Sequence, residues 1–285
     1  MRSKEKKSFK KIAILITMII VFVGAAIFAV NKFSSKKTVA TDKKQKVPIL
    51  LYHHMLTKDE KQANSNAKKS DMIVTSEQFE EQMKYLSEQN YHTLTLKEFE
   101  DFMSGKASIP EKSVLITFDD GLKTNYTHAY PILKKYKQHA TAFLITAKLA
   151  DKEEALDSTK LQRISKKNME EMKDVFDYGS HTDDMHKKVK NVAKIIEGSK
   201  DEVKKDFEKS KNLLHTNAFA YPFGKYNSTD LEILKELDFK FAFTIESKYA
   251  TQESKSLEIG RFGMFPYTSQ KQFIQIVSGK YEKTK

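Results

Sequence analysis

Cysteine is missing from the 285 residues of this sequence, and its absence excludes two kinds of structure. No disulfide framework can hold the fold together, and no thiolate can bind a metal ion. Any metal site must therefore be built from histidine, aspartate and glutamate side chains. The absence does not argue against secretion, because a protein outside the cytoplasm can fold without disulfides.

The main part of the chain also has little net charge, although the whole chain carries a formal charge of +12. Such a charge can indicate a polyanionic partner such as nucleic acid. However, residues 1–46 hold 12 basic and two acidic side chains, which leaves 38 basic and 36 acidic ones for the rest of the chain. We therefore predict no nucleic-acid partner. The remaining 239 residues suit one large domain.

The basic N-terminal segment contains the one long apolar run of the sequence. Six positive residues precede residues 12–30, which form an uncharged stretch of 19 residues. This stretch is long for the core of a signal peptide and just long enough to span a bilayer. We predict a signal peptide or N-terminal membrane anchor over residues 1–30 and a basic polar tether over 31–46; a buried soluble helix is the alternative. The preceding positive charges favour a cytoplasmic N-terminus, so the body would be extracytoplasmic, either secreted and associated with the cell surface or membrane-anchored.

Strand-like and helix-like segments alternate along residues 47–285, and no internal repeat is visible. Short apolar and aromatic segments, several of them continuous, indicate strands of a sheet that is covered on both faces. The predicted strands are 47–53, 113–118, 140–146, 174–181, 218–224, 240–245 and 257–264, and the predicted amphipathic helices are 76–89, 96–104, 125–137, 200–213, 228–237 and 268–277. This alternation predicts an α/β fold with a parallel sheet, either a barrel or an open doubly wound sheet. Two polar stretches interrupt this pattern: 57–74 is predicted as a long loop near the rim of the barrel, and 150–168 is a second polar interruption.

Polar clusters occur where the predicted strands end, which is where a barrel carries its chemistry. The sequences at these ends are "YHH", "DDG", "SHTDDMH" and "YPFG". His181 and His186 are five residues apart, which does not suit one helix face but allows both to reach one ion from a loop. With a carboxylate from another strand they would form a His/His/Asp set that suits Zn²⁺. The alternative is a pair of surface histidines.

The motif "TFDDG" places two carboxylates next to each other at a predicted strand end. Successive side chains of an extended segment point to opposite sides, so Asp119 and Asp120 can address different partners. One carboxylate can bind a metal while the other acts as a general base. Taken alone, the motif favours a turn with an aspartate at a helix N-cap. The histidines that follow a neighbouring strand favour the metal site.

Together these motifs resemble those of the polysaccharide deacetylases, the NodB-homology or carbohydrate esterase family 4 group. The resemblance covers about residues 47–278 and rests on "TFDDG", "SHTDDMH" and "AYPFG". The longer histidine spacing is similar to that of the biofilm poly-β-1,6-N-acetyl-D-glucosamine N-deacetylases. The resemblance implies a distorted (β/α)7-type barrel in a single catalytic domain over residues 47–285.

The resemblance also implies a role for each motif residue. Asp119 would be the catalytic base. One divalent metal ion, Zn²⁺ by preference, would be bound by Asp120, His181 and His186. The backbone N–H of Phe223 would stabilise the oxyanion.

Two departures from the family pattern leave roles open. The arginine that normally orients the base is replaced by Ala220, and the resemblance to the biofilm group suggests Arg261 instead. The late histidine that normally serves as general acid is absent, because no histidine follows His215. The biofilm group uses an early histidine, which implies His53, although His54 is adjacent and the choice between them stays open.

The expected function is metal-dependent N-deacetylation of extracellular poly-β-1,6-N-acetyl-D-glucosamine by an amide hydrolase. The reaction would release acetate and leave a partly cationic polymer for surface retention and biofilm formation. The expected partners are this polymer and, through the N-terminal segment, the cell surface or membrane. The alternatives are deacetylation of peptidoglycan or chitin oligosaccharides and, from another class, a non-catalytic carbohydrate-binding protein on the same fold.

Overall fold

A computed structural model of the chain describes residues 45–282. The predicted signal peptide or anchor, with its apolar run 12–30, and nearly all of the tether lie outside the described residues. Within the described part, the structure contains no helix that combines the length and apolar character needed to cross a bilayer.

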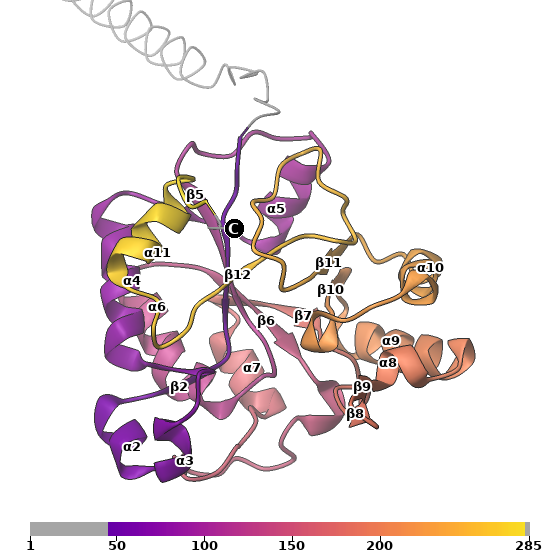
Figure 1. Cartoon of the computed structure of the whole chain (residues 1–285), viewed down its shortest axis with the longest axis horizontal. Coiled ribbons are helices and arrows are strands. Elements are labelled where there is room, and N and C mark those ends of the chain that lie inside the picture. The colour runs from indigo at the N-terminus through magenta and orange to yellow at the C-terminus, as the bar shows by residue number, and fades with distance from the viewer. Residues whose placement is uncertain (1–44, 283–285) are drawn as a thin grey trace, which may run out of the picture. The chain divides into compact units, whose positions relative to one another are not determined.

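A sheet of parallel strands forms the centre of the domain (Figure 1). Its order is β11-β10-β7-β6-β5-β1-β12, with β4 added beside β5. The bounds are β1 Ile49–Tyr52, β4 His92–Thr93, β5 Ser113–Phe118, β6 Ala140–Leu144, β7 Phe176–Ser180, β10 Ala218–Ala220, β11 Phe241–Phe243 and β12 Phe262–Gly263. Each of the seven predicted segments contains a strand of this sheet, although β10 and β12 are much shorter than predicted, and the two-residue strand β4 is an addition.

The segment that leads into β12 brings the two edges of the sheet together. Ile259 forms a parallel bridge with Phe243 of β11, and Phe262 pairs with Leu50 of β1. The same short segment therefore contacts strands from both ends of the sheet. The fold is a distorted (β/α) barrel, which decides between the two topologies that the sequence allowed.

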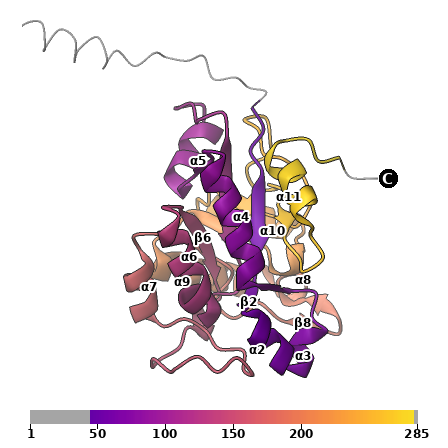
Figure 2. The same cartoon turned by 90° about the vertical axis from the view of Figure 1, so that its left-hand side faces the viewer.

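Helices cover the outside of the sheet (Figure 2). They are α4 Ser76–Glu88, α5 Leu96–Met103, α6 Tyr130–Lys135, α7 Lys166–Met172, α9 Lys200–Leu214, α10 Ser228–Glu236 and α11 Gln270–Val277. Helix α4 shows why they form: Thr75 caps its first turn by accepting a hydrogen bond from the Gln78 N–H, and Phe79 and Met83 are buried on one stripe. A π-helical turn, Asn125–Ala129, precedes α6.

The polar stretch 57–74 is not a loop, and here the prediction was wrong. It contains α2 Lys58–Ala63, α3 Ser65–Lys68 and the start of β3 Ile73–Thr75, which pairs with β2 His54–Leu56. The two short helices have almost no buried side chains and therefore no apolar stripe that a sequence could reveal. They are fixed by capping instead, as by the reciprocal bonds between Thr57 and Glu60. A hairpin, β8 Lys188–Val189 and β9 Val192–Ala193, and helix α8 Lys194–Glu197 were also not predicted.

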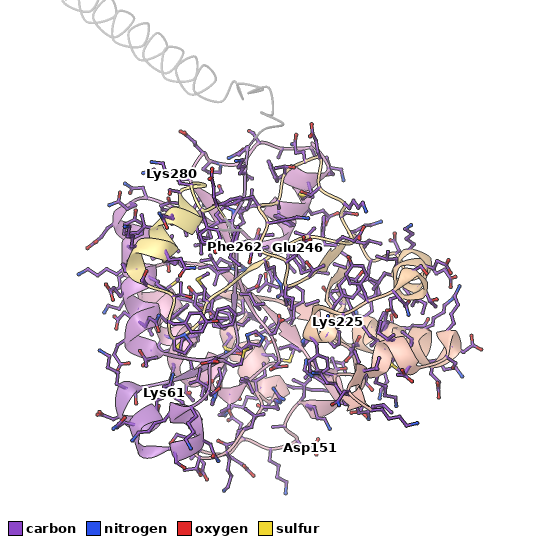
Figure 3. The ribbon with its side chains drawn as sticks, in the orientation of Figure 1. Lys61, Asp151, Lys225, Glu246, Phe262 and Lys280 are labelled. Carbon is purple, nitrogen blue, oxygen red and sulfur yellow. The ribbon has the colours of Figure 1, made fainter. Side chains whose placement is uncertain are left out.

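All strands of the main sheet run in one direction, so their carboxyl ends share one side of the domain. We call this side the catalytic rim. In Figure 1, β1 leads down to β2 and α2, so the catalytic rim faces the bottom of the view. Lys61 and Asp151 lie at that side in Figure 3, whereas Lys280 lies at the opposite side.

Candidate active site

The two aspartates of the "DDG" motif separate at the end of β5. The Asp119 N–H still donates to the Tyr52 carbonyl of β1, at 3.0 Å, so Asp119 continues the strand and is buried. Asp120 and Gly121 then take positive φ angles of 76° and 64°. A Cβ atom on Gly121 would lie 2.8 Å from the Leu144 side chain, so the sharp turn needs glycine. The two carboxylates can therefore serve different partners.

Arg261, the residue before β12, holds the carboxylate of Asp119. Its Nη1 and Nη2 atoms donate to the two carboxylate oxygens at 2.7 and 2.8 Å, and its Nε donates to the Thr244 carbonyl at 3.0 Å. Burial alone would raise the pKa of Asp119, but the guanidinium beside it and the neighbouring His181 hold that pKa well below its ordinary value. Asp119 is thus a fixed, ionised carboxylate, as a general base requires.

Asp120, His181 and His186 come together, with one ligand atom of each within 4.8 Å of the others. The Nε2 atoms of His186 and His181 lie 3.6 and 3.9 Å from Asp120 Oδ1. This oxygen is buried and has no hydrogen-bond partner among residues 45–282, which is costly unless a cation occupies the space beside it. The donor set therefore fits a divalent metal ion such as Zn²⁺.

The histidines are prepared for metal binding by their surroundings. His181 Nδ1 lies 2.7 Å from the Ala220 carbonyl, so this nitrogen is the donor and Nε2 is left for a metal. Burial lowers the pKa of both His181 and His186 and favours the neutral imidazole that binds metals.

Asp206 of α9 fixes the loop between the two histidines. Its two carboxylate oxygens accept the backbone N–H groups of Asp183 and Asp184 at 2.8 and 2.7 Å. The loop also contains Thr182 at a φ of 76°, a conformation that needs support from its surroundings. Sequence reasoning missed Asp206, since one aspartate on an amphipathic helix gives no signal of such a contact.

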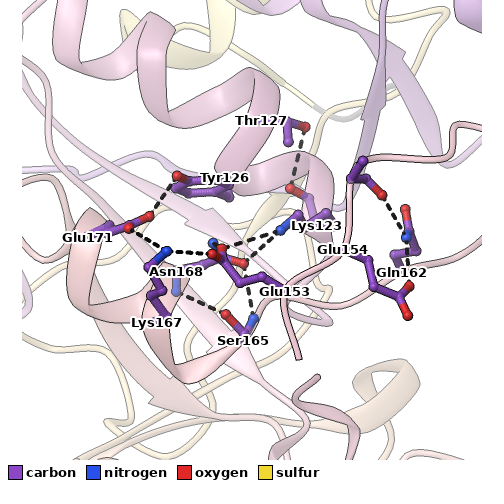
Figure 4. A network of polar contacts seen from close by, with 11 residues as sticks. Lys123, Tyr126, Thr127, Glu153, Glu154, Gln162, Ser165, Lys167, Asn168 and Glu171 are labelled. Atoms are coloured by element: carbon purple, nitrogen blue, oxygen red, sulfur yellow. Dashed lines mark hydrogen bonds and ion pairs between the residues drawn. The ribbon is translucent and has the colours of Figure 1, made fainter. Parts of the chain in front are cut away.

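The second polar stretch, 150–168, forms one flank of the site. Arg163 Nη1 donates to the Asp120 carbonyl at 2.8 Å. Nearby, the buried Lys123 donates to Asn168 Oδ1 at 3.0 Å and lies 3.8 Å from Glu153 (Figure 4). These contacts hold the "DDG" turn in place from segments for which the sequence predicts no role.

The remaining predicted residues also lie close to the site. Phe223 has a φ of 58°, and its ring centroid is 4.4 Å from that of His186. Burial lowers the pKa of His53, while the negative charges of Asp119 and Asp120 act to raise it, so this imidazole lies in the field of both carboxylates. Burial and the neighbouring His128 lower the pKa of His54 to about 4.

The barrel and its site define the class of protein. The sequence pattern of the family described as "Polysaccharide deacetylase" matches residues 106–242. In addition, the "Poly-beta-1,6-N-acetyl-D-glucosamine N-deacetylase" of Staphylococcus epidermidis (strain ATCC 35984) is 31% identical over 271 residues, which cover 90% of this chain and 92% of that protein. The chain belongs to the polysaccharide deacetylase family, whose reaction is the hydrolysis of an amide bond.

Three further proteins are similar to this chain in sequence or in structure. The protein of the same name from Staphylococcus aureus (strain MRSA252) is 38% identical over 197 residues, which span 66% of each chain. The Streptococcus pyogenes deacetylase PplD, solved with acetate, is 30% identical with a TM-score of 0.69, covering 81% of this chain and 98% of that one. IcaB from Ammonifex degensii is 26% identical with a TM-score of 0.67, covering 82% and 96%.

Proposed function

We propose that this protein removes N-acetyl groups from extracellular poly-β-1,6-N-acetyl-D-glucosamine and that the reaction depends on one divalent metal ion, Zn²⁺ by preference. The products would be acetate and a polymer that carries cationic amines. The observation that carries the proposal is the pairing of two adjacent carboxylates, one held by Arg261 and the other placed with His181 and His186. The names of the staphylococcal relatives support the choice of polymer.

The residues of the site suggest how each step would proceed. A metal ion bound by Asp120, His181 and His186 would lower the pKa of the attacking water and polarise the acetamide carbonyl. Asp119, kept ionised and oriented by Arg261, would take the proton from that water. The Phe223 N–H would donate to the developing oxyanion. A non-catalytic carbohydrate-binding protein would have no use for the ionised Asp119.

His53 would return a proton to the departing amine. Burial has the largest effect and lowers the pKa of His53, while the charges of Asp119 and Asp120 act in the opposite direction, so this imidazole faces both carboxylates of the motif. Burial lowers the pKa of His54 as well, to about 4, and the charge that most favours its protonated form is that of Glu60 and not that of Asp119. We therefore assign the general acid to His53.

The setting of the reaction is also part of the proposal. The basic and apolar pattern of residues 1–30 supports a signal peptide or a membrane anchor, and either would place the catalytic domain outside the cytoplasm. Acting there, the enzyme would give a neutral polymer positive charges, which would retain it on an anionic cell surface and promote biofilm formation.

The test is release of acetate from a β-1,6-linked N-acetylglucosamine oligomer by the full chain with Zn²⁺. Asp119→Asn should reduce the rate about 10²- to 10⁴-fold while the protein still binds one equivalent of zinc, since Asp119 is not a ligand. His53→Ala should also reduce turnover without loss of zinc. Asp238→Asn is the matched control. It makes the same change at an exposed aspartate that pairs with Lys240, and it should keep full activity.

Three results would contradict parts of this proposal. No acetate from the wild-type protein, or an equal rate for Asp119→Asn, would remove the assigned activity or the assigned base. Loss of zinc in His53→Ala would make His53 a ligand. A faster reaction with β-1,4-linked oligomers or with peptidoglycan fragments would replace the proposed polymer by one of the alternatives.

A further inference from the structure

Two aromatic rings form an exposed stack on the loop that follows β12. The ring centroids of Phe265 and Tyr267 are 5.2 Å apart, and the ring planes differ by 14°. Tyr267 is 66% exposed, more than any other large hydrophobic side chain of residues 45–282. The stacked pair therefore presents an aromatic face to solvent.

The stack lies at the mouth of the barrel. Side chains alternate along a strand, so Gly263 faces the same side as Arg261, which points to Asp119 in the interior. A Cβ atom on Gly263 would lie 2.5 Å from the ring of Phe265. The Phe265 ring therefore lies over β12 on the catalytic side, in the layer above Arg261, and Tyr267 stacks on it.

The loop that carries the stack is held in place by side chains. Gln78 of α4 donates from Nε2 to the carbonyls of Phe265 and Thr268 at 3.3 and 3.0 Å, and Pro266 O lies 3.4 Å from the same nitrogen. The Phe265 N–H donates to Thr268 Oγ1 at 3.0 Å. Tyr267 is therefore exposed on a turn that hydrogen bonds hold in one conformation. Binding of a ligand to it would cost little conformational entropy of the protein.

We propose that the Phe265–Tyr267 stack binds a hexopyranose ring of the polymer, in a unit next to the one that is deacetylated. The axial C–H groups of a pyranose form an apolar, slightly positive face, which complements the negative face of an aromatic ring. The Tyr267 hydroxyl would remain free to bond a sugar hydroxyl. The choice of a polymeric substrate rests on the proposed function, whereas the binding of the ring can be tested separately.

The chain contains no tryptophan, which makes a direct binding test possible. Tyr267→Trp would give the protein a single tryptophan at the proposed platform. In an Asp119→Asn background, in which turnover is expected to be slow, titration with a β-1,6-linked N-acetylglucosamine pentamer should shift its emission in a saturable manner. Leu213→Trp, at the end of α9 where the strands begin, is the control and should give no shift.

Steady-state kinetics give an independent readout. Tyr267→Ala should raise KM for the pentamer on the order of 5- to 20-fold with little change in kcat, since the tyrosine contacts a unit that does not react. Tyr267→Phe should keep KM within about twofold of the wild type, because it keeps the stacking face.

The proposal would be overturned by a silent Tyr267→Trp reporter in a protein that binds the pentamer by calorimetry, or by equal KM values for Tyr267→Ala and the wild type. A response to phospholipid vesicles and not to the pentamer would also overturn it and assign the stack to a membrane. If the wild type releases no acetate from any oligomer while the reporter still responds to the pentamer, the proposed activity is wrong and the proposed sugar binding by the Phe265–Tyr267 stack is supported.

Discussion

At the scale of single residues, arginine marks the active site. Arg2, Arg163 and Arg261 are the three arginines among 50 basic residues, and the other 47 are lysines. Both arginines of the described part contact the "DDG" motif, one through the Asp119 carboxylate and one through the Asp120 carbonyl. Lysine suffices for solvated charge, whereas a planar fork is needed to hold a carboxylate with two parallel bonds. The rarity of arginine is a signal that could have identified Arg163 from the sequence.

The two arginines should respond differently to replacement by lysine. Arg261→Lys loses one of the two bonds to Asp119 and the bond to Thr244, so the base is misoriented, and we expect kcat to fall about 10- to 100-fold with zinc retained. Arg163→Lys can keep a single bond to the Asp120 carbonyl, and the fall should be less than about fivefold. Acetate release and zinc content measure both. Equal effects would show that the bidentate geometry is unimportant.

At the scale of elements, the site depends on loops that contacts from distant segments hold in shape. The loop between His181 and His186 is not helical. Asp206 of α9 holds it by accepting two successive backbone N–H groups of the loop. A ligand loop that is fixed before metal binding binds more tightly, because its ordering cost has already been met in the folded protein.

Asp206→Asn tests this anchoring. An amide offers one acceptor oxygen in place of two, so one N–H of the loop loses its partner. We expect zinc affinity to fall about 10-fold, measured by competition with a chromophoric chelator, with an unchanged far-ultraviolet circular dichroism spectrum. Glu208→Gln, an exposed change on the same helix, is the control. Unchanged zinc affinity in Asp206→Asn would mean that the loop needs no anchor.

Elements with strong periodicity could be predicted from the sequence, and the others could not. The buried strands around "LITF" and the stripe of α4 follow from residue order alone. Strand β4, the β8–β9 hairpin and the helices α2 and α3 are too short for a periodic pattern, and their pairing and caps determine them. The ligand set could be inferred from motifs, whereas Asp206 and Gln78 act across contacts that leave no local trace.

At the scale of the whole molecule, one buried carboxylate links stability to pH. Asp230 is 1% exposed, its Oδ1 has no partner among residues 45–282, and burial raises its pKa to about 6. The folded state therefore binds a proton more readily than the unfolded state, whose aspartate has a pKa near 3.9. The contribution of Asp230 to the free energy of unfolding should increase as the pH falls from about 6.5 to about 4.

Urea unfolding between pH 4.5 and 7.5 can measure this effect. The free energy of unfolding of the wild type minus that of Asp230→Asn should rise by about 2 kcal/mol as the pH falls from 7.5 to 4.5, since each pKa unit is worth about 1.4 kcal/mol and the unfolded aspartate titrates only near 3.9. Asp201→Asn, in the exposed first turn of α9, should give a difference that does not change in this way. A constant difference for Asp230→Asn would mean that its carboxylate titrates normally.

The closure of the barrel by β12 has a consequence for how the enzyme matures. Arg261 balances the charge of the Asp119 carboxylate. It is added to the growing chain 142 residues after Asp119. A nascent chain therefore has its predicted metal ligands before it has the group that orients its base. A chain cut short before residue 261 would keep Asp119 and the predicted metal ligands but would lack the arginine that balances the charge of the Asp119 carboxylate.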